Sequence, residues 1–174
     1  MAPKKQFDIL ILEDEQEIAQ IMKTYLKLFP PFHRIVYAEN GLQAAQKVSN
    51  QSFDLIITDI QLNKQSALSF IERLRKQPRF YNQKIMVVSG CLTQEITLKL
   101  MRLGIRYILV KPFTARQLLI NAISCLGIEK KPENLVDNII VKVKGRFSDE
   151  KDRFENAVPD DKLSDMIKNS KGEK

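Results

Sequence analysis

Five short apolar runs, each followed by a segment with apolar residues at helical spacing, organise this sequence. The runs cover residues 7–12, 34–38, 54–59, 85–89 and 105–110. Apolar runs of this length, rich in β-branched residues, are typical of strands buried on both faces in a parallel sheet. Strands that alternate with helices in this way predict a doubly wound α/β domain with right-handed connections.

The segments between the runs contain residues that begin or end helices. Asn40-Gly41 should open the second helix, and Pro30-Pro31 should end the first. Pro78 should limit the third helix, and Gly104 should cap the fourth at its carboxyl end. These signals support the expected order of elements.

Residues 128–174 follow the last strand–helix unit and have a weaker pattern. The apolar residues after Pro132 are Leu135, Val136, Ile139, Ile140 and Val143. Their spacing predicts a helix that ends at Gly145. A strand over residues 139–143 is the alternative, because these residues are largely β-branched. Further apolar residues near 163–167 predict a short helix.

Composition limits where such a chain can work. No apolar run approaches the roughly 20 residues of a membrane helix, so we expect no membrane contact. Residues 1–5 lack the apolar core of a secretory signal. Cys91 and Cys125 are too few for a disulfide framework and fit reduced core thiols. We therefore expect a cytoplasmic protein.

The formal net charge of +7 lies on the main domain. Residues 1–126 hold 17 Lys and Arg against 10 Asp and Glu, and residues 127–174 hold 11 of each class. A neutral tail argues against a basic arm that binds nucleic acid, so we expect no nucleic-acid partner. The basic surface of the main domain favours either acidic partners or simple solvation.

Acidic residues follow two of the expected strands. Glu13-Asp14-Glu15 follow the first strand and Asp59 ends the third. Strands one and three are neighbours in a doubly wound sheet, so these carboxylates should crowd together and raise one another's pKa. A divalent cation would relieve the repulsion, and Mg²⁺ prefers such oxygen ligands. Alone, residues 13–15 could be a solvated helix start, but together with Asp59 they favour a metal site.

A hydroxyl and an amine follow two other strands. Ser89-Gly90 end the fourth strand and Lys111-Pro112 follow the fifth. Alone, Ser89 could cap a helix and Lys111 could be a surface charge. Acids with a metal on one side, and hydroxyl and ammonium donors on the other, instead describe a site for a phosphoryl group.

With these residues in place, the sequence resembles the receiver domain of two-component response regulators. The matching pieces are Ile9-Leu10-Ile11-Leu12-Glu13-Asp14-Glu15, Ala38-Glu39-Asn40-Gly41, Asp54-Leu55-Ile56-Ile57-Thr58-Asp59, Val87-Val88-Ser89-Gly90 and Val110-Lys111-Pro112-Phe113. The resemblance covers residues 6–127 and implies a flavodoxin-like (βα)5 sandwich. Its five-stranded parallel sheet should have the order 2-1-3-4-5. Residues 128–174 would be a short, helical and partly flexible extension with no recognised effector fold.

The resemblance also implies a role for each site residue. Asp59 would be the phospho-acceptor, and its phosphoryl donor would be a sensor histidine kinase or a histidine phosphotransfer protein. Glu13, Asp14, Asp59 and the backbone carbonyl of Gln61 would bind Mg²⁺. Lys111 would pair with the acyl phosphate across a cis Lys-Pro bond, and Ser89 would bond a phosphoryl oxygen.

The sequence departs from the family around the expected switch. Ile108 stands where the family has an aromatic residue, and Tyr107, one position earlier, should face the other side of the strand. Asn63 and Ala67 replace a usual Pro and Gly in the loop after the acceptor.

Leu98 and Met101 should lie opposite the buried arc of the fourth helix. With Ile108 they would form an output surface for a protein target, or a homodimer contact through the fourth helix and fifth strand. The alternative is that the tail covers this surface. The residues expected to cover it are Leu135, Ile139 and Ile140.

The leading hypothesis is a phospho-accepting response regulator in a two-component or phosphorelay system, with output by protein–protein contact. The alternative is a receiver-fold adaptor that works without phosphorylation. A haloacid-dehalogenase-type phosphatase needs a second Asp two residues after the nucleophile, where this chain has Gln61. We therefore expect no turnover enzyme.

Overall fold

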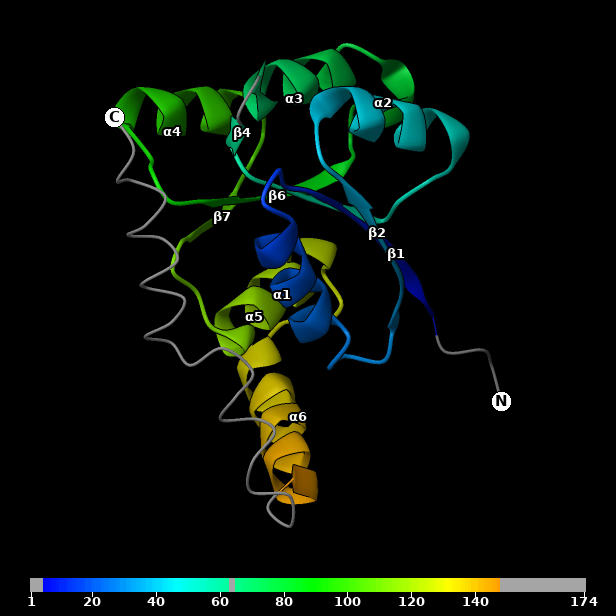
Figure 1. The fold of residues 1–174 in the computed structure, drawn as a ribbon, viewed down its shortest axis with the longest axis vertical. Coiled ribbons are helices and arrows are strands. Elements are labelled where there is room, and N and C mark those ends of the chain that lie inside the picture. Colours follow the sequence, from blue (N-terminus) through cyan, green and yellow to red (C-terminus); the bar gives the residue numbers. More distant parts are fainter. Residues whose placement is uncertain (1–4, 63–64, 148–174) are drawn as a thin grey trace.

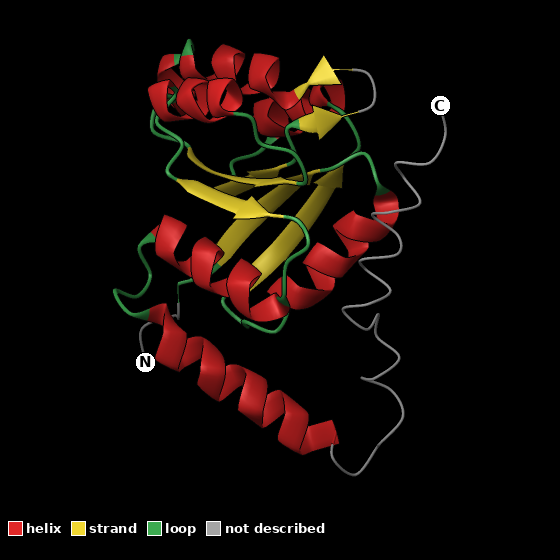
Figure 2. Cartoon of the chain, turned by 90° about the vertical axis from the view of Figure 1, so that its left-hand side faces the viewer, coloured by secondary structure: helices red, strands yellow, loops and turns green. Residues whose placement is uncertain are grey.

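The computed structural model describes residues 5–62 and 65–147, which fold around a five-stranded parallel sheet with helices on both faces (Figures 1 and 2). The sheet strands are β1 (Phe7–Leu12), β2 (Phe32–Ala38), β3 (Leu55–Thr58), β6 (Lys84–Ser89) and β7 (Tyr107–Val110). The helices are α1 (Gln16–Leu26), α2 (Gly41–Asn50), α3 (Ala67–Arg75), α4 (Gln94–Arg102), α5 (Ala115–Leu126) and α6 (Pro132–Phe147), with one 3₁₀ turn (Pro78–Phe80).

The order β2-β1-β3-β6-β7 confirms the expected topology, because these are the first to fifth strands of the sheet in chain order. All four strand pairs are parallel. The doubly wound α/β class follows directly. Because the strands are parallel, the carboxyl ends of β1, β3, β6 and β7 lie at one edge of the sheet. In such sheets ligands bind at this edge.

Two hydrophobic layers fill the space between the sheet and its helices. Ile9 and Ile11 pack in the layer under α1 and α5, whereas Leu10 and Leu12 pack in the layer under α2, α3 and α4. These four side chains are fully buried, which explains an apolar run without alternation. Each buried side chain of this size contributes about 1.5–3 kcal/mol to stability.

Most of the described helix ends follow the sequence signals. The Asn40 side chain accepts from the Gln43 amide at 3.0 Å at the start of α2, and Gly104 after α4 has a φ of 75°. Only a glycine adopts this left-handed conformation without strain. The first helix stops at Leu26, before the expected Pro30-Pro31. Phe29 lies in the turn beyond it and packs edge-on against Phe32, with ring centroids 4.8 Å apart.

A small antiparallel hairpin follows the acceptor strand. Its strands are β4 (Gln61–Leu62) and β5 (Gln65–Ser66), and the sequence pattern did not indicate it. Two-residue strands are too short to show a period of two. The Ser66 side chain then accepts from the Leu68 amide at 3.2 Å and opens α3.

The helical alternative for the tail is correct, although α6 continues through Gly145 to Phe147. Val136 on α6 is fully buried in the layer that contains α1 and α5. Leu135, Ile139 and Ile140 pack against the same layer. The alternative in which these three residues cover the fourth helix is therefore wrong, because α6 docks on α5 instead (Figure 2).

The short helix expected near residues 163–167 lies outside the described residues. Within residues 5–62 and 65–147, no helix combines the length and the apolar character needed to cross a bilayer.

Candidate functional site at the carboxyl edge of the sheet

The site residues are held by the sheet ladder, which continues one residue past three strands. The amide of Glu13 donates to the Ala38 carbonyl at 3.1 Å. The amide of Asp59 donates to the Leu12 carbonyl at 3.0 Å, and the amide of Lys111 to the Ser89 carbonyl at 2.9 Å. The backbone therefore places Glu13, Asp59 and Lys111 at one edge with little freedom.

Lys111 joins the two acids. Its Nζ donates to Asp59 Oδ2 at 2.6 Å and to Glu13 Oε2 at 2.7 Å. All three side chains are buried, so the pairs are shielded from water. Charged hydrogen bonds of this length are about twice as strong as neutral ones. The alternative that Lys111 is a surface charge is excluded, because its side chain is buried between the two acids.

The charges at this edge do not balance. One ammonium faces two carboxylates, and the residue after Glu13 is a further acid, half-buried Asp14. Burial raises the pKa of Glu13 to about 7, because Lys111 only partly offsets the loss of solvent and Asp59 adds repulsion. Burial works to lower the pKa of Lys111, but Glu13 and Asp59 outweigh it and the pKa is raised. The edge therefore favours additional positive charge.

The second oxygen of Asp59 is held by the following turn. Asp59 Oδ1 accepts from the Gln61 amide at 2.9 Å, and the Ile60 carbonyl accepts from the Ala67 amide at 3.2 Å. The hairpin after β3 thus fixes the Asp59 side chain from the side opposite Lys111. The group of Gln61 that contacts Asp59 is its backbone N–H.

Ser89 ends β6 at the same edge and is fully buried. Its Oγ donates to the Cys91 carbonyl at 3.4 Å. It does not cap α4, where Thr93 accepts from the Ile96 amide instead. Cys91 itself is exposed, so only Cys125 is the buried thiol that the composition predicted. The Lys111-Pro112 peptide bond is cis.

The donor set fits a hard divalent cation in chemistry, since carboxylates are the ligands that Mg²⁺ prefers. In this arrangement one oxygen each of Glu13 and Asp59 accepts from Lys111. Among residues 5–62 and 65–147, no set of three or more Asp, Glu, His or Cys side chains encloses a common coordination point. Glu13 and Asp59 lie close together, but the group between them is the Lys111 amine.

The expected output surface is partly open. Leu98 and Met101 on α4 are 48% and 64% exposed, and neighbouring Val110 on β7, which the sequence pattern did not single out, is 56% exposed. Ile108 is half-buried against the layer under α4. Tyr107 packs on the opposite layer, as its position predicted, and its hydroxyl donates to the Ser124 carbonyl on α5 at 3.0 Å.

A family model described as the response regulator receiver domain matches residues 9–123. Hybrid signal transduction histidine kinase D of Dictyostelium discoideum is 23% identical over 131 residues, 75% of this chain and 8% of that protein. The probable C4-dicarboxylate response regulator DctR of Halalkalibacterium halodurans is 28% identical over 118 residues, 68% of this chain and 50% of that protein.

The chain thus spans half or less of the length of these two curated relatives. Among solved structures, chemotaxis protein CheY4 of Vibrio cholerae superposes with a TM-score of 0.64 at 22% identity. That match covers 69% of this chain and 98% of the other, and at this identity it concerns the fold.

Proposed function

The chain belongs to the response regulator receiver domain family, and from this premise we propose that Asp59 accepts a phosphoryl group from a phosphohistidine. The donor is a sensor histidine kinase or a histidine phosphotransfer protein. The observation that supports this most strongly is the buried contact of Lys111 with Asp59 and Glu13 at the carboxyl edge of the sheet.

The reaction uses Asp59 as a carboxylate nucleophile. An Oδ atom of Asp59 attacks phosphorus, the P–N bond of the phosphohistidine breaks, and the imidazole leaves with the bonding pair. Lys111 carries positive charge beside the attacking group and stabilises the charge that develops on the phosphoryl oxygens. The amide of Gln61 holds the other carboxylate oxygen in position, and the Ser89 hydroxyl bonds a phosphoryl oxygen of the product.

Receiver domains generally bind Mg²⁺ at an acidic pocket, and we extend this to Glu13, Asp14, Asp59 and the Gln61 carbonyl. When bound, the ion supplies positive charge against the phosphoryl oxygens. Glu13 and Asp59 hold negative charge that a single lysine does not neutralise, which supports this assignment.

Receiver domains are generally signalling modules and not turnover enzymes, and Gln61 lacks the acid that a related phosphatase would need. We propose that residues 6–127 form the receiver unit and 128–174 an extension without an effector fold. Exchange with a kinase would place the chain in the cytoplasm. Output would be a protein contact, or a homodimer through α4 and β7, at Leu98, Met101 and Ile108.

The second candidate is a receiver-fold adaptor that binds its partner without phosphorylation. Ile108 stands at the position of the family's aromatic switch, and Tyr107 is tied to α5 on the opposite layer. These residues give the site no aromatic side chain that could move with Ser89, which is the observation in favour of this candidate.

The test is incubation of the full chain with acetyl phosphate and Mg²⁺, followed by intact mass measurement and a partner-binding assay. We expect a single phosphoryl mass in the wild type and none in Asp59→Asn. Glu72→Gln, an exposed acid on α3, is the matched control and should react like the wild type. No gain in the wild type contradicts the proposal, and a gain that leaves shape and partner binding unchanged favours the adaptor.

A further inference from the structure

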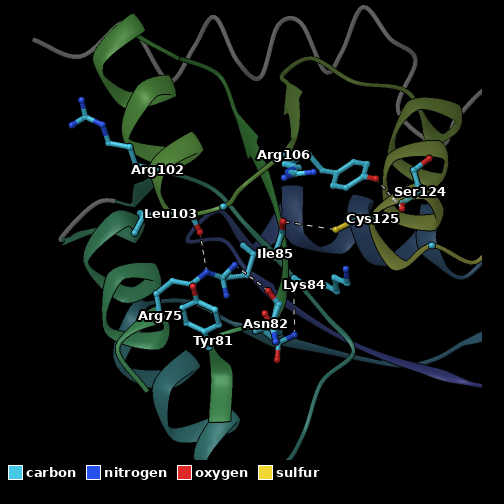
Figure 3. Close-up of a pocket in the computed structure, with 14 residues that line it drawn as sticks. Arg75, Tyr81, Asn82, Lys84, Ile85, Arg102, Leu103, Arg106, Ser124 and Cys125 are labelled. Carbon is cyan, nitrogen blue, oxygen red and sulfur yellow. Dashed lines mark hydrogen bonds between the residues drawn. The ribbon is translucent and has the colours of Figure 1, made fainter. Parts of the chain in front are cut away.

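A cavity of about 690 Å³ lies at the opposite edge of the sheet from Asp59, where β6 and β7 begin (Figure 3). Its walls come from the ends of α3, α4 and α5 and from the loop before β6. This size lies within the range of small-molecule sites and exceeds the space that one inorganic phosphate fills. The proposed phosphorylation site does not use this cavity.

Four positively charged residues line the cavity. They are Arg75, Lys84, Arg102 and Arg106. Figure 3 shows Arg75, Lys84 and Arg106 around the cavity, whereas Arg102 projects from α4 away from them. No Asp or Glu is among the described residues that line it. Within residues 5–62 and 65–147, none of the four makes an ion pair.

These positive charges could serve only the fold, by bonding backbone carbonyls and by neutralising helix ends. That explanation accounts for only part of the charge. Arg75 donates to the carbonyls of Leu103, Phe80 and Gln83 at 2.9, 3.0 and 3.0 Å, so it ties the end of α4 to the loop before β6. Each helix end contributes roughly half a negative charge. Arg102 projects away (Figure 3), so three helix ends offset about one and a half of the three positive charges around the cavity, and roughly one and a half remain.

The remaining charge is placed for a ligand. Lys84 begins β6 and Arg106 directly precedes β7, and both are exposed. Burial lowers the pKa of Arg75, whose half-buried guanidinium already donates to three backbone carbonyls, so Lys84 and Arg106 are the cations left to meet an anion. Tyr81 at the rim is 67% exposed and offers a flat ring for stacking.

From this arrangement we propose that the cavity at the start of β6 and β7 binds a phosphorylated small molecule of nucleotide size. The charged groups contact its phosphates, and the Tyr81 ring stacks on its planar part. Binding there does not depend on the chemistry of Asp59.

The test is a calorimetric titration of the full chain with ATP, inorganic pyrophosphate and adenosine, without Mg²⁺ and at physiological salt. Amide shifts at Asn82 and Gly104 locate the site, and Gly90 reports on the edge that holds Asp59. We expect ATP and pyrophosphate to bind and shift Asn82 and Gly104, with adenosine much weaker.

The variant Lys84→Gln/Arg106→Gln should weaken ATP at least tenfold. Lys27→Gln/Lys47→Gln removes the same charge far from the cavity and should change affinity less than twofold. Absence of binding by ATP and pyrophosphate at millimolar concentration overturns the proposal. Equal weakening in both double variants also overturns it, because the attraction would then come from net charge alone.

Discussion

Lys111 Nζ lies 2.6 Å from Asp59 Oδ2, although the two residues are 52 positions apart in the chain and belong to ends of non-adjacent strands. The same amine also donates to Glu13, which follows β1, the strand that pairs with β3. A single cation thus holds two buried carboxylates together. The stability and the reactivity of the edge should both depend on it.

Lys111→Met should leave Glu13 and Asp59 buried without a positively charged partner. Removing one member of a buried ion pair costs about 3–5 kcal/mol of unfolding free energy. We expect urea denaturation without Mg²⁺ to show a loss of this order, and added Mg²⁺ to restore part of it. Lys111→Met/Asp59→Asn removes the repulsion and should recover stability. If Lys111→Met alone proves as stable as the wild type, the electrostatic account is contradicted.

Tyr107→Phe should remove one hydrogen bond to the Ser124 carbonyl and leave the ring in place. The expected cost is about 1 kcal/mol of unfolding free energy. Acetyl phosphate should modify the variant as fast as the wild type, because Tyr107 packs on the layer away from Ser89. Thermal unfolding and the rate of mass gain check the two parts. A large fall in that rate would show that Tyr107 acts in the switch.

Val136→Ala should weaken the docking of α6 on α5, because this side chain is fully buried. The expected loss is about 2 kcal/mol of unfolding free energy. Val141→Ala on the same helix is the control, since Val141 is 67% exposed and its change should have little effect. Equal losses in both variants would contradict this packing, because the change in helix propensity from Val to Ala is favourable at both positions.

Ionisation of the buried Cys125 thiol should make the stability of the fold depend on pH. Burial raises the pKa of its thiol from 9.0 to about 11. The unfolded thiol therefore ionises first, and stability falls as pH rises from about 9 to 11, by about 3 kcal/mol in full. Denaturant midpoints should fall more steeply over this range in the wild type and in Cys91→Ala than in Cys125→Ala. Parallel curves for all three proteins contradict this.

The sequence was sufficient for the positions of the site residues but not for their contacts. Parallel strands bring their carboxyl ends to one edge, so Glu13, Asp59, Ser89 and Lys111 could be placed together from strand ends alone. Which oxygen meets the amine depends on side-chain packing between residues 98 and 52 positions apart. No local pattern encodes that choice.

Elements that depend on packing were predicted less well. The apolar residues of α6 fit a helix, but their spacing did not show whether they would dock on α4 or α5. The hairpin Gln61–Leu62 with Gln65–Ser66 is too short to produce a period. The cavity lined by Lys84 and Arg106 joins segments that carry no motif, so only the structure brings its charges together.

The most direct measurement of the central proposal locates the phosphoryl group on the chain. The protein is treated with acetyl phosphate and Mg²⁺, reduced with borohydride, which converts an aspartyl phosphate to homoserine, and mapped by peptide mass spectrometry. The account predicts homoserine at position 59 and an unmodified Asp54 and Asp14. Homoserine at another position, or none in a chain that has gained phosphate, would contradict it.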